Sequence, residues 1–264
     1  MELSILIKAL ILGIVEGLTE FLPVSSTGHL IIVGDYLNFN DEHGKVFEIV
    51  IQLGAILGVL WDYRTRVGRL ITGLNQKHEQ KFALNLFIAF LPAAIVGLLF
   101  HTYITTHLFN PVTVAWALIV GGILILVIER LPIRVRFQSV EDLGPMEAVK
   151  IGIAQTFSLF PGTSRAGATI MGGLLAGLSR TAATEFSFLL AMPVMFAAFF
   201  YELLKNFHLL HADDIPIFSA GFVMAFVSAL IVVKAFLRFV SRHNFTSFAI
   251  YRIVFGILVL MYFR

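Results

Sequence analysis

Apolar runs long enough to cross a lipid bilayer recur along this chain and limit the folds open to it. A helix needs about 20 mostly apolar residues to cross the hydrocarbon layer. Of the 264 residues, 58% are hydrophobic, and the mean hydropathy is +0.88. The sequence therefore predicts an all-α polytopic membrane protein with a single membrane domain over residues 1–264. Six apolar spans are expected, at about residues 47–61, 83–100, 112–128, 183–201, 216–236 and 246–263.

Charge and cysteine content exclude several classes of protein. The formal net charge is +2 and the basic residues are not gathered in one tract, so no nucleic-acid partner is expected. The chain has no cysteine, which excludes a disulfide framework and thiolate chemistry. Residues 1–8 lack a basic region, and no cleavage site follows the first apolar run, so no removed signal peptide is expected.

Residues 13–34 form an apolar segment that nevertheless contains Glu16, Glu20 and His29. A carboxylate in hydrocarbon costs at least ~2.5 kcal/mol, so these acids are expected to face a cavity or a partner. Glu16 and Glu20 are four residues apart and would leave one face of a helix. Pro23 is expected to end that helix because proline lacks an N–H and restricts the residue before it. The segment is therefore predicted to be a broken helix.

Hydroxyl residues follow this break. Ser25, Ser26 and Thr27 can cap the helix that begins there, and Gly28 is expected to let the backbone turn tightly. Capping alone would explain the hydroxyls if no charges lay nearby. Because acids and an imidazole share the segment, a role in binding or chemistry stays open for them. His29 taken alone is more often a hydrogen-bonded structural residue than a catalyst.

A second interrupted segment, at about residues 148–180, contains Pro161-Gly162-Thr163-Ser164-Arg165-Ala166-Gly167-Ala168-Thr169. Backbone N–H groups at a helix start, beside a guanidinium, make an anion site suited to phosphate. Carboxylates opposite could hold a divalent cation that bridges to phosphate oxygens, or act as general base or acid. The alternative is that Arg165 only neutralises Glu16 or Glu20 as a buried ion pair.

Loop charge predicts the orientation of the chain. The basic stretches, which the positive-inside rule places in the cytoplasm, are 62–82, 129–147 and the tract Lys234, Arg238 and Arg242. The connections that are acidic or poor in cations are 35–46, 101–111 and 202–215. This alternation works only if residues 1–34 enter and return on the outer side and residues 148–180 on the inner side. Both interrupted segments are therefore predicted to be re-entrant, with both termini outside.

The two halves of the chain also resemble each other. The paired stretches are Gly13-Ile-Val-Glu16 with Gly152-Ile-Ala-Gln155, Phe21-Leu-Pro-Val-Ser-Ser26 with Phe160-Pro-Gly-Thr-Ser164 after a one-residue shift, and Asn110 to Leu124 with Asn244 to Leu258, which share Gly122 and Gly256. We therefore predict an inverted-topology repeat, about 1–130 and about 146–264, each half one re-entrant helical hairpin plus three transmembrane helices. In such folds the site lies near the bilayer midplane, where the broken helices meet.

Four further polar residues lie in or beside predicted spans. Glu48 and Gln52 are four apart and could either join helices or serve the site. Glu185 is expected to cap a helix or pair with Arg180. Arg252, in the last span, is expected to pair internally or to reach the interface.

The motifs carry a family resemblance. Glu16-Gly-Leu-Thr-Glu20-Phe-Leu-Pro-Val-Ser-Ser26-Thr-Gly-His29 resembles the first signature of the bacterial undecaprenyl-diphosphate phosphatase family, the bacitracin-resistance type, and residues 161–169 resemble the second. The resemblance implies a phosphatase that hydrolyses undecaprenyl diphosphate to undecaprenyl phosphate and inorganic phosphate. It would act on the outer face of the bacterial plasma (inner) membrane, recycle the lipid carrier for peptidoglycan synthesis, and give bacitracin resistance. A divalent cation, Mg²⁺ or Ca²⁺, is the implied cofactor.

By that resemblance, Glu16 and Glu20 would bind metal or act as acid and base, Ser26 would be the candidate nucleophile, His29 a proton-transfer partner and Arg165 the phosphate clamp. The supporting substrate-binding residues would be Ser25, Thr27, Gln52, Gly162, Ser164 and Thr169. Many members have serine where this chain has Ala166, so that position is given no role. Attack by Ser26 and attack by water, activated by Glu20 or His29, both stay open.

Broken helices that meet at the midplane are also typical of secondary transporters. A secondary transporter or polyprenyl-phosphate flippase is therefore the alternative function. The expected partners are a polyprenyl diphosphate lipid substrate and bilayer lipids, and a homodimer is left open.

Overall fold

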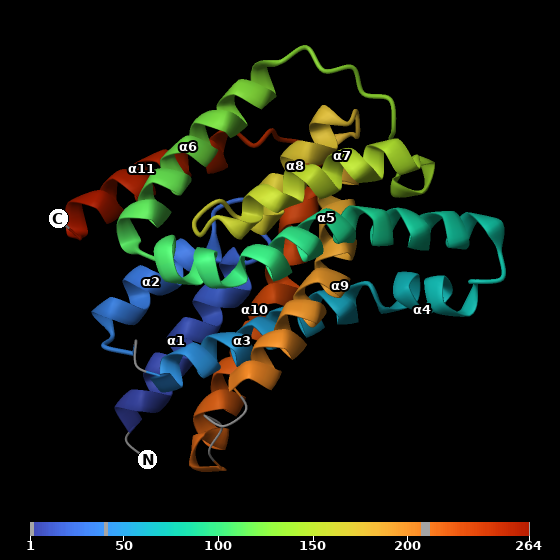
Figure 1. Ribbon diagram of the computed structural model, residues 1–264. Coiled ribbons are helices and arrows are strands. Elements are labelled where there is room, and N and C mark those ends of the chain that lie inside the picture. The colour runs from blue at the N-terminus through green and yellow to red at the C-terminus, as the bar shows by residue number, and fades with distance from the viewer. Residues whose placement is uncertain (1–2, 40–41, 207–211, 264) are drawn as a thin grey trace.

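The computed structural model describes residues 3–39, 42–206 and 212–263, and this part of the chain is helical almost throughout (Figure 1). No β-strand occurs within it beyond one isolated bridge between Phe137 and Leu178. The α-helices are α1 (Leu3–Thr19), α2 (Ser26–Tyr36), α3 (Glu42–Asp62), α4 (Arg64–Thr72), α5 (Lys77–His107), α6 (Pro111–Arg130), α7 (Pro145–Thr156), α8 (Arg165–Leu175), α9 (Arg180–Asn206), α10 (Ile215–Val240) and α11 (Thr246–Tyr262). Short 3₁₀ turns are η1 (Val140–Asp142), η2 (Phe157–Leu159) and η4 (Ala212–Asp214).

Several helices are long and apolar enough to cross a bilayer. Among the described residues these are α5, α6, α9 and α10, with a fifth if α3 and α4, bent by 74°, count as one span. The apolar helix α11 is shorter, at 17 residues. The helices at the two breaks are shorter still: α2 and α8 have 11 residues each, about 17 Å of helix, against a hydrocarbon layer of about 30 Å. The prediction of an all-α polytopic membrane protein is confirmed at this level.

Two predicted loops are partly helical. The basic stretch 62–82 contains α4 and the first turns of α5, and these two elements project together from the body of the molecule (Figure 1). At the other end α5 continues to His107, so most of the connection predicted at 101–111 is helix. Hydropathy detects the apolar part of a helix, and polar helical turns beyond the hydrocarbon layer escape it.

Both predicted breaks occur, and each ends in a strained serine. The first lies between Thr19 and Ser26, and the second between η2 and α8. Ser25 and Ser164 have φ values of 70° and 73°, a region that residues other than glycine rarely occupy. Ser164 caps α8 by accepting a hydrogen bond from the Gly167 N–H at 3.1 Å.

Two local predictions about the first break are wrong. Ser25 holds the N-cap position of α2, but its side chain makes no capping hydrogen bond. Gly28 lies inside α2 rather than in a turn, because Ser25 itself makes the turn. Gly28 instead lets α2 approach α6: a Cβ on Gly28 would lie 3.1 Å from Leu118 Cδ1.

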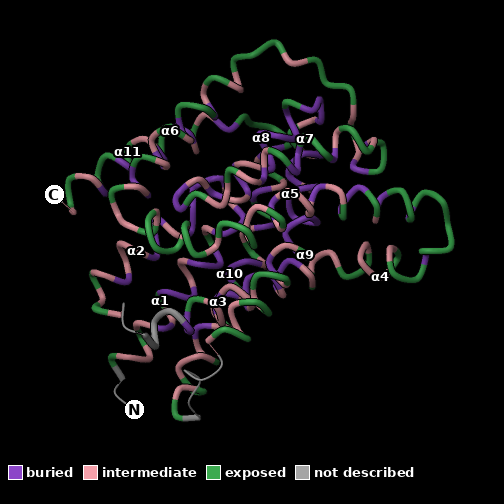
Figure 2. The backbone as a smooth tube through the Cα atoms, viewed as in Figure 1, coloured by how far each residue is buried: buried purple, intermediate pink, exposed green. Residues whose placement is uncertain are grey.

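The helices pack in pairs that join distant parts of the sequence. Helix α10 packs along α1 and α3, α11 along α6, α5 along α7, and α8 along α9. Figure 2 shows buried backbone gathered in the interior and exposed backbone on the outer sides of α5, α6 and α11. Large apolar side chains such as Trp116, Val120, Ile250 and Val254 are exposed on α6 and α11. A broad apolar surface of this kind suits contact with lipid.

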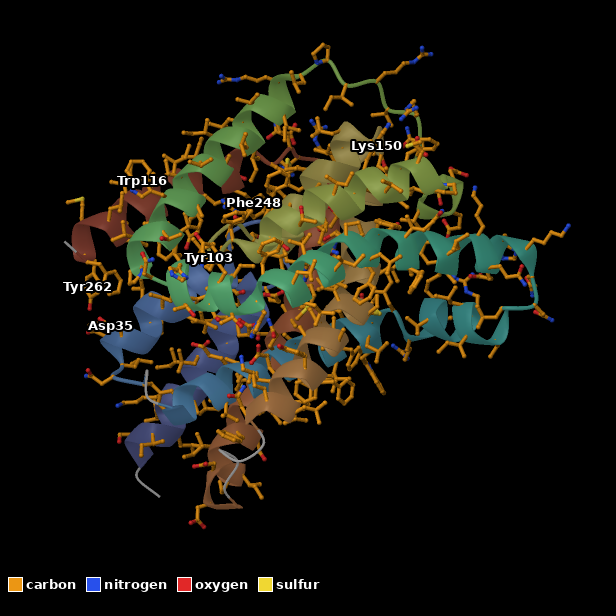
Figure 3. All side chains as sticks on the ribbon, in the orientation of Figure 1. Asp35, Tyr103, Trp116, Lys150, Phe248 and Tyr262 are labelled. Carbon is orange, nitrogen blue, oxygen red and sulfur yellow. The ribbon has the colours of Figure 1, made fainter. Side chains whose placement is uncertain are left out.

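Polar contacts fix the ends of several helices. The Tyr262 hydroxyl donates to Asp35 Oδ2 at 3.0 Å and ties the end of α11 to α2 (Figure 3). The guanidinium of Arg180 binds the Glu129 carboxylate through Nε at 3.1 Å and Nη2 at 2.5 Å. The predicted pairing of Arg180 with Glu185 is therefore wrong, because Glu129 on α6 takes the guanidinium.

Candidate active site

The two helix breaks lie against each other. The Ser164 hydroxyl, at the end of the second break, donates to the Leu22 carbonyl of the first at 3.3 Å. Pro23 and Thr163, one on each break, both direct a carbonyl at the guanidinium of Arg252. Ser26 and Arg165 are the first residues of α2 and α8, so these contacts bring the starts of the two helices close together.

The centre of the site is the Glu20 carboxylate. Its Oε2 accepts a hydrogen bond from the Ser26 hydroxyl at 2.5 Å, and its Oε1 accepts one from Arg165 Nη2 at 3.1 Å. Glu20 is 8% exposed and the Arg165 side chain 11%. Hydrogen bonds to ionised groups are strong, and water competes little for them at this burial. A hydroxyl, a carboxylate and a guanidinium therefore form one chain across the two breaks.

The Arg165 guanidinium is held on its other side by α9. Its Nη1 donates to the Ser187 carbonyl at 3.2 Å, and the guanidinium lies 5.3 Å from the centre of the Phe21 ring. Its Nε is buried and has no hydrogen-bond partner among the residues that the structure describes. A buried N–H without a partner is uncommon and points to a group that binds there.

Glu16 lies beside this chain of hydrogen bonds and is 1% exposed. Its Oε2 is buried and makes no hydrogen bond within the described part of the chain. The carboxylates of Glu20 and Glu48 repel that of Glu16, and the charge of Arg165 attracts it. Glu48 on α3 therefore belongs to the electrostatic surroundings of the site. An unpaired carboxylate oxygen among other acids needs a proton or a cation.

Ser187 on α9 supports the second break, a role that was not predicted from the sequence. Its hydroxyl lies 2.6 Å from Thr169 Oγ1, and Thr169 Oγ1 lies 2.9 Å from the Arg165 carbonyl. Thr169 therefore acts on the backbone of α8 rather than at the Glu20 carboxylate. The sequence signals for Ser187 were a hydroxyl within the apolar residues of a predicted span and the family resemblance of the stretch Glu185-Phe-Ser-Phe-Leu-Leu-Ala that contains it.

His29 is hydrogen-bonded to groups other than the Glu20 carboxylate. Its Nδ1 donates to the Ser25 carbonyl at 2.7 Å, so in the neutral ring Nε2 accepts from the Tyr251 hydroxyl at 2.6 Å. The ring stacks on Phe255, with centroids 4.3 Å apart. His29 also lines a mostly apolar cavity of about 300 Å³. Neither ring nitrogen is hydrogen-bonded to Ser26 or Glu20.

The remaining predicted residues lie on α2 and α3 or in the breaks. Gln52 on α3 and Thr27 on α2 are half-buried, and neither side chain makes a hydrogen bond within the described residues. Gly162, with φ 93°, is buried against α6, and its carbonyl accepts from Arg252. Ser25 is buried, and its carbonyl holds His29.

A divalent cation would find two carboxylates here. Within the described ranges, no group of three or more acidic, histidine or cysteine side chains could hold a metal. Glu16 and Glu20 fit the other common arrangement, in which one or two carboxylates and a substrate phosphate share a magnesium ion. The unpaired Glu16 Oε2 is the observation that favours this fit.

Comparison with known proteins gives the family of the chain. The family model of the bacitracin resistance protein BacA matches residues 9–258. The undecaprenyl-diphosphatase of Nitrosospira multiformis is 61% identical over 262 residues, covering 99% of this chain and 96% of that protein. The undecaprenyl-diphosphatases of Dechloromonas aromatica and Methylobacillus flagellatus are 59% and 55% identical, over 98% and 100% of this chain and 95% and 100% of their own lengths. The chain therefore belongs to the bacitracin resistance protein BacA family.

Proposed function

We propose that this protein is an undecaprenyl-diphosphatase that hydrolyses undecaprenyl diphosphate to undecaprenyl phosphate and inorganic phosphate. The observation that carries the proposal is the chain of hydrogen bonds from Ser26 through Glu20 to Arg165, beside the unpaired Arg165 Nε and Glu16 Oε2. The full-length relatives bear the name of this activity. Release of the monophosphate would recycle the lipid carrier for peptidoglycan synthesis and account for bacitracin resistance.

In the first step, Ser26 Oγ attacks the terminal phosphorus and Glu20 Oε2 accepts the hydroxyl proton. Nucleophile and base lie within hydrogen-bond reach, and Arg165 orients the base, which is the arrangement that activates serine nucleophiles. The bond from phosphorus to the bridging oxygen breaks, undecaprenyl phosphate leaves with that oxygen, and the proton passes from Glu20 to it. A phosphoserine is formed.

In the second step, water attacks the phosphoserine while Glu20 takes one of its protons. The bond from phosphorus to Ser26 Oγ breaks, inorganic phosphate leaves, and the proton returns to Oγ. Arg165 stabilises the equatorial phosphate oxygens through Nε, its free donor. Phosphoryl transfer depends mainly on positioning and charge stabilisation, and these residues supply both.

The substrate carries several negative charges next to Glu16 and Glu20, so the site needs further positive charge. Glu16 and Glu20 would hold a divalent cation, Mg²⁺ or Ca²⁺, which when bound offsets the charge of the diphosphate. Arg165 alone cannot neutralise two carboxylates and a diphosphate. The site in this proposal binds cation and substrate together.

We further propose the inverted repeat, and helix contacts support it. A Cβ on Gly13 would lie 2.3 Å from a carbonyl of α10, and one on the matching Gly152 would lie 2.8 Å from a carbonyl of α5. Gly122 and Gly256 approach each other's helix reciprocally, with 2.7 Å to a carbonyl of α11 and 2.8 Å to one of α6. Matching glycines thus make matching contacts in both halves.

The strained serines support the same repeat and change its alignment. Ser25 and Ser164 share a positive φ and the N-cap position of α2 and α8. Their separation along the chain equals that of Gly13 and Gly152, so Ser25, rather than Ser26, matches Ser164. The one-residue shift inferred from the letters alone is unnecessary.

The proposed site opens on the outer face of the bacterial inner membrane. The support is the loop charge, which places the basic stretches in the cytoplasm, together with α2 and α8, each too short to cross the hydrocarbon layer. Re-entrant breaks that enter from opposite sides would meet near the midplane, where a lipid headgroup reaches them from the leaflet.

The test is phosphate release from a polyprenyl diphosphate by purified protein in detergent. The parent is expected to release phosphate, and Ser26→Ala is expected to lose turnover. Rapid quenching of the parent's reaction during turnover is expected to trap a phosphoserine at Ser26. No release by a folded parent would refute the phosphatase and favour the secondary transporter. Turnover by Ser26→Ala close to that of the parent would leave water, activated by Glu20, as the nucleophile.

A further inference from the structure

Arg252 on α11 is a fully buried cation whose five N–H donors all bind backbone carbonyls. Its side chain is 0% exposed. The hydrogen bonds run from Nε to Leu118, from Nη1 to Pro23 and Thr163, and from Nη2 to Ala117 and Gly162, over 2.8–3.3 Å. No carboxylate shares this guanidinium among the described residues. A residue that served only as half of an ion pair would have an acidic partner.

Three of the five carbonyls that Arg252 binds belong to the two helix breaks. Pro23 lies two residues before Ser25 in the first break, and Thr163 lies two residues before Arg165 in the second. Nη1 alone joins them, at 3.1 Å to the Pro23 carbonyl and 2.8 Å to the Thr163 carbonyl. Nη2 adds the Gly162 carbonyl of the second break, and the last two bonds, to carbonyls of α6, fix the guanidinium against a third element. One rigid planar group thus sets the distance between the breaks.

The surrounding backbone is shaped to admit this guanidinium. A Cβ on Gly121 of α6 would lie 2.2 Å from Arg252 Nη2, and a Cβ on Gly167 of α8 would lie 3.3 Å from Nη1. Gly121 is therefore needed for the guanidinium to reach its carbonyls. Substitution of Gly121 therefore offers a second way to displace the guanidinium without changing Arg252 itself.

We propose that Arg252 is a positioning residue that holds the two breaks in register, so that Ser26 and Glu20 meet Arg165 in the geometry for phosphoryl transfer. The inference rests on the proposed function. Arg252 does not contact the substrate, because all its donors bind backbone. Its charge, which pairs with no carboxylate of the described ranges, adds to the positive potential at the anion site beside it.

The first test compares kcat and KM for phosphate release by the parent, Arg252→Lys, Arg252→Met and Gly121→Ala. Misplacing catalytic groups by about 1 Å can cost about 10²-fold in rate, so kcat is expected to fall about that far in Arg252→Met and Gly121→Ala. Lysine keeps the charge but not the planar fork, so Arg252→Lys is expected to retain more of the parent kcat than Arg252→Met does, but not all of it. KM is expected to change far less than kcat. The matched control is Arg238→Met, an exposed arginine of α10, which should keep the parent rate.

The second test asks whether Arg252 acts through Arg165. Arg252→Met is combined with Arg165→Lys, and the loss in kcat is compared with the product of the single losses. If Arg252 places Arg165, its substitution should cost much less in the Arg165→Lys background. If the loss in kcat of the double variant equals the product of the two single losses, the proposal is overturned, because Arg252 would then act independently of Arg165.

The third test needs no activity. Amide hydrogen exchange is measured for the parent and Arg252→Lys, and for Arg252→Met where it folds. Faster exchange confined to residues 20–27 and 160–167 is expected. Unchanged exchange there, or a uniform rise that includes α3 and α10, would refute the proposal that Arg252 joins the two breaks. A parent that releases no phosphate would refute the proposed function, while the exchange data would still judge whether Arg252 joins the breaks.

Discussion

At the scale of single residues, Glu20 carries the most specific evidence, because its two carboxylate oxygens serve different partners. Oε2 faces the Ser26 hydroxyl and Oε1 faces Arg165. In Glu20→Gln an amide can still bind Arg165 but cannot accept the serine proton. The expected loss in kcat is about 10²–10⁴-fold, the usual contribution of a general base.

The measurement for Glu20→Gln is the initial rate of phosphate release at saturating substrate. Its matched control is Asp213→Asn, which makes the same carboxylate-to-amide change at an exposed position of η4. A rate for Glu20→Gln equal to that of the control would remove Glu20 from the chemistry.

The unpaired oxygen of Glu16 leads to a prediction about metal. We expect a chelator to abolish turnover and added Mg²⁺ or Ca²⁺ to restore it, and we expect Glu16→Gln to need a higher cation concentration for half-maximal rate. The physical reason is that the variant loses one charged ligand while Glu20 remains. Titration of phosphate release with each cation measures this. Full activity in excess chelator would contradict the metal proposal.

At the scale of helices and breaks, the sequence predicted the features that local chemistry dictates. The missing N–H of Pro23 marks the first break, and the apolar residues of α6 and α10 mark their spans. The full extent of α5 was missed because its polar ends, at 77–82 and 101–107, are helical without being apolar. Hydropathy measures preference for lipid, and a helix that continues into water gives no such signal.

Only some contacts of the candidate site were predicted from the sequence, for a related reason. The four-residue spacing predicted that Glu16 and Glu20 leave one helix face, but α1 ends at Thr19, so Glu20 lies in the break, where its N–H still bonds the Glu16 carbonyl. The meeting of Glu20 with Arg165 followed from the expected repeat. Ser187 and Tyr251, which hold Thr169 and His29, were not predicted, because such contacts depend on how distant helices pack. A single sequence carries no record of those pairings.

Close packing of α6 on α11 depends on Gly256. A Cβ there would lie 2.7 Å from Ile119 Cγ1 and 2.8 Å from the Ala115 carbonyl, so Gly256→Ala must push the helices apart. We expect a lower thermal unfolding midpoint in detergent. Gly97→Ala is the matched control: its Cβ would meet only Leu159 Cδ2, at 3.5 Å, and alanine favours helix by about 1 kcal/mol. A midpoint for Gly256→Ala at or above that of Gly97→Ala would contradict this packing.

At the scale of the whole molecule, loop charge predicts the orientation, and the absence of cysteine makes it easy to test. Single cysteines are introduced at Thr106, near the end of α5, and at Gln138, in the basic stretch after α6; both positions are exposed. An impermeant thiol reagent is expected to label Thr106→Cys in spheroplasts and Gln138→Cys only after permeabilisation. The reverse pattern would place the basic stretches outside and invert the proposed topology.

The central claim is that two helix breaks from opposite halves of one chain unite an acid and a guanidinium into a phosphatase site. Its most direct test is the rate of phosphate release from a polyprenyl diphosphate by the parent, Arg165→Lys and Arg165→Met, each shown to be folded. The account predicts release by the parent, a loss of about 10²–10³-fold for Arg165→Lys and no detectable turnover for Arg165→Met. Equal rates for the parent and Arg165→Met would contradict it.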